Sequence, residues 1–354
     1  MVITNSREQL WSEMSTCINR VRFPLIFMII LLHCYSVVQL PGSHLIYFKT
    51  IYPFALWLGE TGVPGFFFIS GYLFYCNTRK SYRDKIHTRF RTLLSPYIIW
   101  NSLLLAIYLI AYLLGHPQDI NGKNIADFSW TDYLRLYWDR GNYDNGNFVP
   151  LLCPYWYIRN LLILSLFSPV IYFIIKHIGK IFILAISIWW MLTYNNAFIP
   201  QSILFFSLGA FFSIHDIIPI QIFKQWKSVF WGLFIVFGLA DIFTHAFSPC
   251  ILNLQIHRLA LIANIPILFL IASYSTSTSK VATLLGKSSF IVFSISYPII
   301  VLLRKGCVMF FGSGNDYTHI LLYICCIIVS TLLSLLFYLS LPTKISNILS
   351  GNRS

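Results

Sequence analysis

An arginine and a histidine in the first apolar segment, Arg22 and His33, are the residues of this sequence best suited to chemistry. Their spacing corresponds to roughly three turns of helix, so both side chains lie on one face, about 16 Å apart along the axis. An ionisable side chain near the centre of a bilayer costs at least about 2.5 kcal/mol and usually marks a functional site. The pair therefore predicts a site that extends along this helix.

The two side chains predict different tasks. The imidazole of His33 can accept and return a proton near neutral pH, which is the property of a general base. The guanidinium of Arg22 lies at the depth of lipid phosphates and can bind phosphate through two parallel hydrogen bonds. The separation resembles the pantetheine arm of coenzyme A, from its pyrophosphate to its thioester. The structural alternatives are a hydrogen bond between helices for His33 and snorkelling to the interface for Arg22.

The composition requires a membrane protein. Of the 354 residues, 57% are hydrophobic, 10% are charged, and the mean hydropathy is +0.70, which excludes an ordinary soluble domain. We expect one all-α transmembrane bundle over residues 1–354, with a cytoplasmic tail at 1–20, an extracytoplasmic loop at 115–154 and a cytoplasmic tail at 342–354. The net charge of +13 reflects this topology, so no nucleic-acid partner is predicted.

Ten apolar segments are candidate spans, and the distribution of Lys and Arg predicts that both termini are cytoplasmic. The fifth and sixth segments are short and could form a broken or re-entrant pair. The segments are 23–40, 52–75, 93–114, 155–175, 180–194, 199–214, 228–247, 258–274, 289–303 and 319–341.

An acidic residue, Glu60, precedes a stretch of small and aromatic residues, Gly62 to Tyr72, in the second expected span. Glu60 would lie about 14 Å into this span, at a depth similar to that of His33. It is therefore a candidate catalytic residue that orients the imidazole of His33 or stabilises its charge. The alternative is a buried carboxylate that pairs with another helix.

Two further arginines, Arg89 and Arg91, lie where the third expected span begins on the cytoplasmic side. Basic residues at this depth bind anionic lipid headgroups or the phosphates of a nucleotide. We therefore assign them, with Arg22, to a cofactor-binding set. A solvated run of charges would have the same sequence pattern.

On the outer side, three residues are candidates for binding an acceptor: Trp156, Arg159 and Asp241. Arg159 could contact an acceptor, stabilise an oxyanion, or pair with Asp241 or Glu60. Asp241 belongs to a polar group with His245, His257 and Arg258, which could line an acceptor cavity or form a proton relay. The eight cysteines are scattered without the Cys and His spacing of a zinc site, so no metal is predicted.

The sequence resembles the acyltransferase 3 family of integral-membrane acyltransferases over most of its length. Arg22 and His33 match the arginine and histidine of the family's first helix, and Arg89 and Arg91 match its basic entry to the third helix. One stretch departs from the pattern, because many members have a histidine in the ninth span where this chain has Ser296-Tyr297-Pro298. The other matching stretches are Pro64 to Tyr72, Arg89 to Tyr97, Tyr155 to Asn160 and Gly286 to Phe290.

This resemblance implies a membrane O-acyltransferase of the bacterial cytoplasmic membrane. The expected donor is cytosolic acyl-CoA, commonly acetyl-CoA, and the expected acceptor is a hydroxyl of an envelope polysaccharide or glycolipid. The protein would contact membrane lipids, and His33 would act as the general base. The alternative is a proton-coupled transporter or flippase of a glycan or lipid, in which His33, Glu60 and Asp241 would carry protons.

Overall fold

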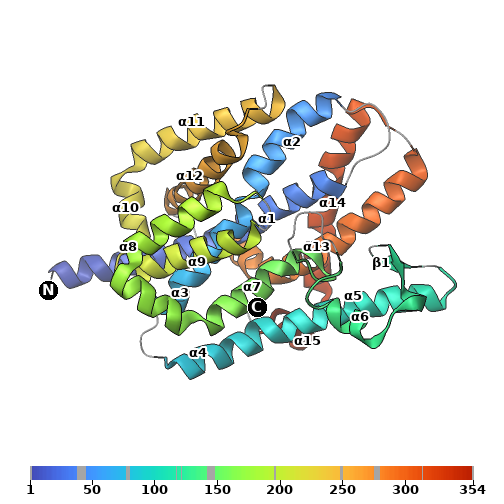
Figure 1. Cartoon of the computed structure of the whole chain (residues 1–354), viewed down its shortest axis with the longest axis horizontal. Coiled ribbons are helices and arrows are strands. Elements are labelled where there is room, and N and C mark those ends of the chain that lie inside the picture. Colours follow the sequence, from blue (N-terminus) through green and yellow to red (C-terminus); the bar gives the residue numbers. More distant parts are fainter. Residues whose placement is uncertain are drawn as a thin grey trace.

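The chain folds into a bundle of helices with one short strand pair (Figure 1). The computed structural model describes residues 2–352, apart from 38–44, 77–79, 117, 121, 142–147, 195–196, 248–249, 275–279 and 313. The described helices are α1 (Val2–Val37), α2 (Leu45–Gly59), α3 (Gly62–Cys76), α4 (Tyr82–Arg89), η1 (Phe90–Leu94), α5 (Ser95–Leu113), η2 (Ile125–Asp127), α6 (Trp130–Arg135), η3 (Cys153–Tyr155), α7 (Trp156–Leu166), α8 (Ser168–Leu192), α9 (Phe198–Ile214), α10 (Pro219–Gln225), α11 (Lys227–Ala246), α12 (Asn253–Tyr274), α13 (Lys280–Phe311), α14 (Asp316–Ser340) and α15 (Thr343–Ser350).

Seven described helices are long and apolar enough to cross a membrane, or up to eight if one bent pair counts as a span. The sequence predicted ten, and this count is not confirmed: one expected span is divided between two short helices, and one helix crosses the boundary between two other expected spans. Residues 52–75 fall into two helices of 15 residues each, α2 and α3, which meet at Glu60 and Thr61. The spans are Glu8–Tyr35, Tyr82–Leu113, Ser168–Leu192, Lys227–Ala246, Asn253–Tyr274, Lys280–Phe311 and Asp316–Ser340.

The broken segment lies later in the chain than the sequence indicated. The structure has one helix, α8, across the expected boundary between 155–175 and 180–194, with a kink at Ile178. The sharp bend instead separates α9 from α10, whose axes differ by 95°. Pro219 begins α10, and its missing backbone N–H donor suits the first turn of a new helix.

Both expected tails are partly helical. Residues 2–20 belong to α1, so the first helix extends well beyond its apolar part. At the other end, α15 packs against α5, where Trp100 Nε1 donates a hydrogen bond to the backbone oxygen of Leu349 at 3.0 Å. Gly351 closes α15 with a positive φ of 67°, a conformation that glycine adopts without steric cost.

Close packing of α3 and α9 forms the centre of the bundle. A Cβ atom on Gly71 would overlap the backbone oxygen of Phe206, and one on Gly209 would overlap that of Phe68. Small residues of this kind allow membrane helices to approach closely. In Figure 1, α1 crosses the middle of the molecule, and its first residues lie at the opposite end from β1 and α6.

The loop expected at 115–154 has its own small structure in the parts that are described. Strands β1 (Asp119–Ile120) and β2 (Lys123–Asn124) pair antiparallel, and Ser129 caps α6 through reciprocal hydrogen bonds with Asp132. The hydrogen bonds from Lys123 and Ser129 lower the pKa of the Asp132 carboxyl. The loop is therefore a folded element against the end of α5.

Candidate functional site

A cavity of about 300 Å³ lies among α1, α3, α7, α13 and the junction of α4 with α5. Three cationic side chains line it: Arg22, Arg89 and Lys287. None of the described lining residues is acidic, so the cavity carries an excess of positive charge. Its other lining residues are Ile26, Phe66, Ile69, Ser70, Leu73, Thr92, Tyr157, Leu161, Gly286, Ser289, Phe290 and Phe293.

A local change in helix geometry positions one of these cations. Arg89 ends α4 and is followed at once by a π-helical turn, Phe90–Leu94, before α5 begins. Such turns are uncommon and frequently occur at functional sites. Arg89 is directed inward, with its guanidinium 5.5 Å from the ring centroid of Phe74 and Nη2 at 3.5 Å from the backbone oxygen of Ser70.

The face of α1 that lines the cavity continues toward His33. Arg22 and Ile26 are one turn apart in the lining, and His33 follows about 10 Å further along the same helix. On α13, Phe293 lines the cavity, and Tyr297 follows one turn later. The rings of His33 and Tyr297 are in edge contact, with centroids 5.0 Å apart. The two helices therefore lead from the cationic cavity to the imidazole.

The surroundings of His33 include residues that the sequence did not single out. The guanidinium of Arg140 and the thiol of Cys153 lie close enough to the Tyr297 hydroxyl to interact with it electrostatically. Arg140 comes from the loop that follows α6, and Cys153 begins the short helix before α7. Elements far apart in the sequence thus meet at the end of the path that leads from the cavity.

The other predicted members of the donor and base groups lie elsewhere. Arg91 does not line the cavity, because its Nε and Nη2 lie 3.0 and 3.1 Å from the side-chain amide of Asn352. The expected contact between Glu60 and His33 is also not found. Glu60 Oε2 instead accepts a hydrogen bond from His257 Nε2 at 3.1 Å. Five residues were predicted to bind the donor or to form the catalytic base. Of these, Arg22 and Arg89 line the cavity, and His33 lies further along α1.

The candidate residues for the acceptor side are separated in the structure. Arg159 donates hydrogen bonds to the backbone oxygens of Trp138 and Phe148, so it holds the loop before α7 and does not pair with Asp241 or Glu60. Trp156 is 8% exposed and stacks on Phe198, with ring centroids 3.8 Å apart. Both therefore stabilise the start of α7.

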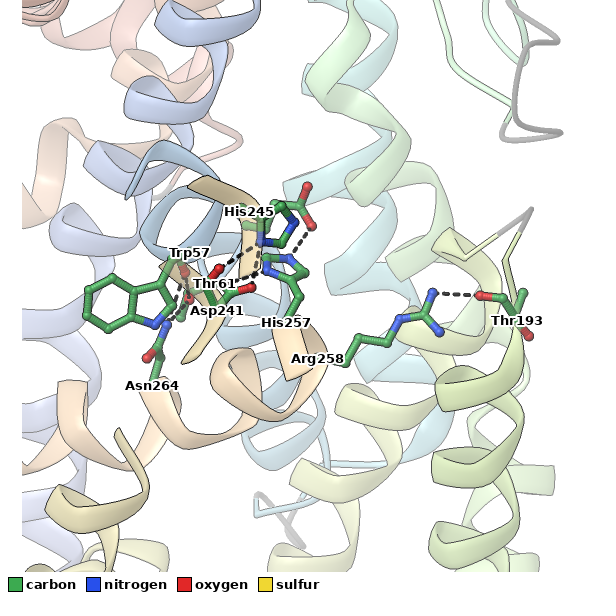
Figure 2. Close-up of polar contacts among 9 residues, drawn as sticks. Trp57, Thr61, Thr193, Asp241, His245, His257, Arg258 and Asn264 are labelled. Atoms are coloured by element: carbon green, nitrogen blue, oxygen red, sulfur yellow. Dashed lines mark hydrogen bonds and ion pairs between the residues drawn. The ribbon is translucent and has the colours of Figure 1, made fainter. Parts of the chain in front are cut away.

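Asp241, the third acceptor-side candidate, is fully buried in a cluster shown in Figure 2. Its Oδ2 lies 2.9 Å from His257 Nδ1, and its Oδ1 lies 2.9 Å from His245 Nδ1. Glu60 completes the cluster through His257. The sequence grouped Asp241 with both histidines, and the contact of Glu60 with His257 on α12 matches the second reading of Glu60, a carboxylate that pairs with another helix.

Sequence reasoning missed several residues of the site, and these residues differ in whether the sequence carried a signal for them. Lys287 and Tyr157 lie in stretches that were noted only as matches to a family pattern, and Tyr297 was noted only as a departure from it. Arg140 and Cys153 had no local signal, because a single loop arginine and a single cysteine are common in any sequence. Only the three-dimensional contact with Tyr297 identifies them.

The arrangement has two chemically distinct ends. Three cations at one end suit a ligand that carries several phosphates. At the other end, an imidazole beside a tyrosine, an arginine and a thiol suits proton transfer at a hydroxyl group. Aromatic and aliphatic side chains between the two ends suit an apolar linker.

Comparison with known proteins agrees with this arrangement. A family model for the acyltransferase domain of the acyltransferase 3 family matches residues 16–339. The chain is 27% identical over 274 residues to the succinoglycan biosynthesis protein ExoH of Rhizobium meliloti. The aligned region covers 70% of this chain and 68% of that protein. No solved structure matches the chain.

Proposed function

This chain belongs to the acyltransferase 3 family, and we propose that it transfers an acyl group, most simply acetyl, from cytosolic acyl-CoA to a hydroxyl of an envelope polysaccharide or glycolipid. The observation that carries the proposal is the cationic cavity that leads along α1 to His33. A polysaccharide acceptor is supported by the similarity to a succinoglycan biosynthesis protein.

Coenzyme A fits the cavity by charge and by length. Its phosphates would bind Arg22, Arg89 and Lys287, and each charge-assisted hydrogen bond contributes about 1.5–3 kcal/mol. The pantetheine arm would then extend along α1 past the apolar side chains of Ile26 and Phe293. This brings the thioester to the depth of His33, about 16 Å from Arg22.

The reaction follows from the position of the imidazole. His33 accepts the proton of the acceptor hydroxyl while its oxygen attacks the thioester carbonyl carbon. The C–S bond then breaks, the new ester C–O bond remains, and the imidazolium returns its proton to the coenzyme A thiolate. Arg140 and Tyr297 lie beside the imidazole and can donate hydrogen bonds to the carbonyl oxygen as it gains negative charge.

The orientation in the membrane is part of the proposal. The cavity would open to the cytosol, where acyl-CoA is made, with both termini on the same side of the bacterial cytoplasmic membrane. The loop at 115–154 would then face outward, toward the acceptor. Arg159 holds this loop against α7, which favours a fixed entrance for the glycan.

A transfer assay tests the proposal directly. The purified protein in nanodiscs is incubated with radiolabelled acetyl-CoA and extracted envelope polysaccharide, and label in the polysaccharide is measured. We expect transfer by the unmodified protein and by His177→Gln, which removes an exposed imidazole on α8, but not by His33→Ala. Absence of both transfer and coenzyme A binding across several acyl donors would overturn the proposal. Transfer by His33→Ala would exclude this histidine as the base.

A further inference from the structure

The cluster around Asp241 has the donor atoms of a metal site. Asp241, His245 and His257 each offer one ligand atom, and these atoms lie within 4.8 Å of one another. Carboxylate oxygens and imidazole nitrogens are the ligands that zinc and similar divalent ions prefer in proteins. Among the described residues, this is the one group of three such side chains gathered so closely.

The fold brings these ligands together from two helices. Asp241 and His245 are one turn apart on α11 and so share one face, and His257 lies one turn after the start of the adjacent helix α12. Figure 2 shows Asp241 between the two imidazoles. The site is closed to solvent, because the side chains of Asp241, His245 and His257 are 0%, 13% and 9% exposed.

A second observation at this position also indicates a missing partner. Oδ1 of Asp241 is buried and accepts no hydrogen bond. His245 Nδ1 lies 2.9 Å from it but bonds the backbone oxygen of Asp241 at 3.0 Å. A buried carboxylate oxygen without a donor costs about 1–3 kcal/mol or more, which a bound cation would offset.

The contact with Glu60 matches the environment of metal-binding histidines. Such histidines usually donate the proton of their other ring nitrogen to a carboxylate, which fixes the tautomer. His257 directs Nδ1 to Asp241 and Nε2 to Glu60. Glu60 is itself placed by the end of α2, where Asn264 Nδ2 donates to the Trp57 oxygen at 3.1 Å and to Thr61 Oγ1 at 2.7 Å (Figure 2).

We propose that Asp241, His245 and His257 bind one divalent transition-metal ion, such as zinc, and that Glu60 orients His257 for this task. The two carboxylates supply the negative charge that a divalent cation neutralises in an apolar bundle. The site ties α11 to α12 and, through Glu60, to the end of α2. It shares no residue with the cationic cavity, so it stands independently of the proposed function.

Metal analysis of the unmodified protein is the first test. The chain is purified with a tag that contains no histidine, exchanged into nanodiscs, and analysed by inductively coupled plasma mass spectrometry. We expect about one zinc, or a comparable divalent ion, per chain. Replacement by Co²⁺ should give visible absorption bands typical of cobalt with nitrogen and oxygen ligands. A content far below one ion, with no binding of added Zn²⁺ or Co²⁺, overturns the proposal and leaves a hydrogen-bonded cluster.

Substitutions then identify the ligands. His257→Gln and His245→Gln should each lower the affinity for Zn²⁺ by more than about 100-fold, and Glu60→Gln should lower it by about 10- to 100-fold. His177→Gln, which removes an exposed histidine on α8, is the control and should leave the affinity unchanged. Metal retained equally by all four variants would show binding elsewhere and overturn the proposal. If one variant fails to fold, the cobalt spectrum of the unmodified protein and of Glu60→Gln still decides the outcome.

Discussion

The cationic cavity and the Asp241 cluster place ionisable groups in the same bundle in opposite ways. The cavity gathers three cations, and none of its described lining residues is acidic. In the cluster, each carboxylate faces an imidazole, and Asp241 is fully buried. Charge in an apolar bundle is costly unless it is paired. Unpaired charge beside a cavity therefore indicates an external ligand, whereas internally matched charge in a closed cluster indicates a structural role or an enclosed ion.

The two regions also differ in how they connect helices. The cavity is an open space among five elements, and only its path toward His33 follows regular spacings along α1 and α13. The cluster joins side chains from α2, α11 and α12. A change in the cavity should therefore alter ligand binding or turnover more than folding. A change in the cluster should alter folding more than turnover.

The largest effect is expected when the imidazole at the end of the cavity is removed. His33→Gln should lower the rate of acyl transfer at least about 100-fold, because general acid–base catalysis contributes about 10²- to 10⁴-fold. The measurement is kcat for transfer to polysaccharide, with the melting temperature recorded in parallel. His177→Gln should retain the rate, since its imidazole contacts only its own helix at the Phe173 oxygen. An unchanged rate for His33→Gln would show that the end of the cavity at His33 is not catalytic.

The next effect concerns the donor. Arg22→Ala and Arg89→Ala should each raise the KM for acyl-CoA by about 10- to 100-fold, because each removes a charge-assisted contact to phosphate. Arg83→Ala removes an exposed arginine of α4 and is the control. Arg91→Ala distinguishes the sequence-based prediction from the structural one. The sequence assigns Arg91 to the donor site, whereas its contact with Asn352 predicts only a small change in the KM for acyl-CoA. An increase equal to that of Arg89→Ala would restore Arg91 to the donor site.

These variants also show what the sequence could determine. Arg22 and His33 lie on one helix, so helical spacing alone placed them on one face. Contacts between helices were beyond such reasoning. The pairing of Glu60 with His257 depends on the break between α2 and α3, which a continuous apolar segment from 52 to 75 did not reveal. The expected ten spans are not confirmed as ten long helices, in part because of the same break.

A smaller effect is expected from Glu60→Gln, which tests whether Glu60 belongs to the Asp241 cluster or to the catalytic end of the cavity. The Glu60 side chain is 39% exposed and accepts a hydrogen bond from His257, so we expect a stability loss of about 1 kcal/mol and a smaller change in turnover. Thermal unfolding in nanodiscs and the transfer rate are measured on the same preparation. A loss of transfer as large as that of His33→Gln, without loss of stability, would join Glu60 to the catalytic end.

The smallest effect is expected from Tyr297→Phe, which keeps the ring against His33 and removes only the hydroxyl. That hydroxyl interacts electrostatically with Arg140 and Cys153, so its loss should let the guanidinium move and lower kcat by about fivefold, the equivalent of about 1 kcal/mol. The KM for acyl-CoA should stay the same, because Tyr297 lies beyond the lining of the cavity. Tyr274→Phe, at an exposed position of α12, is the control. A loss of kcat near that of His33→Gln would indicate that Tyr297 donates a proton in the reaction. An unchanged kcat would indicate that Arg140 and Cys153 only hold the loop in place.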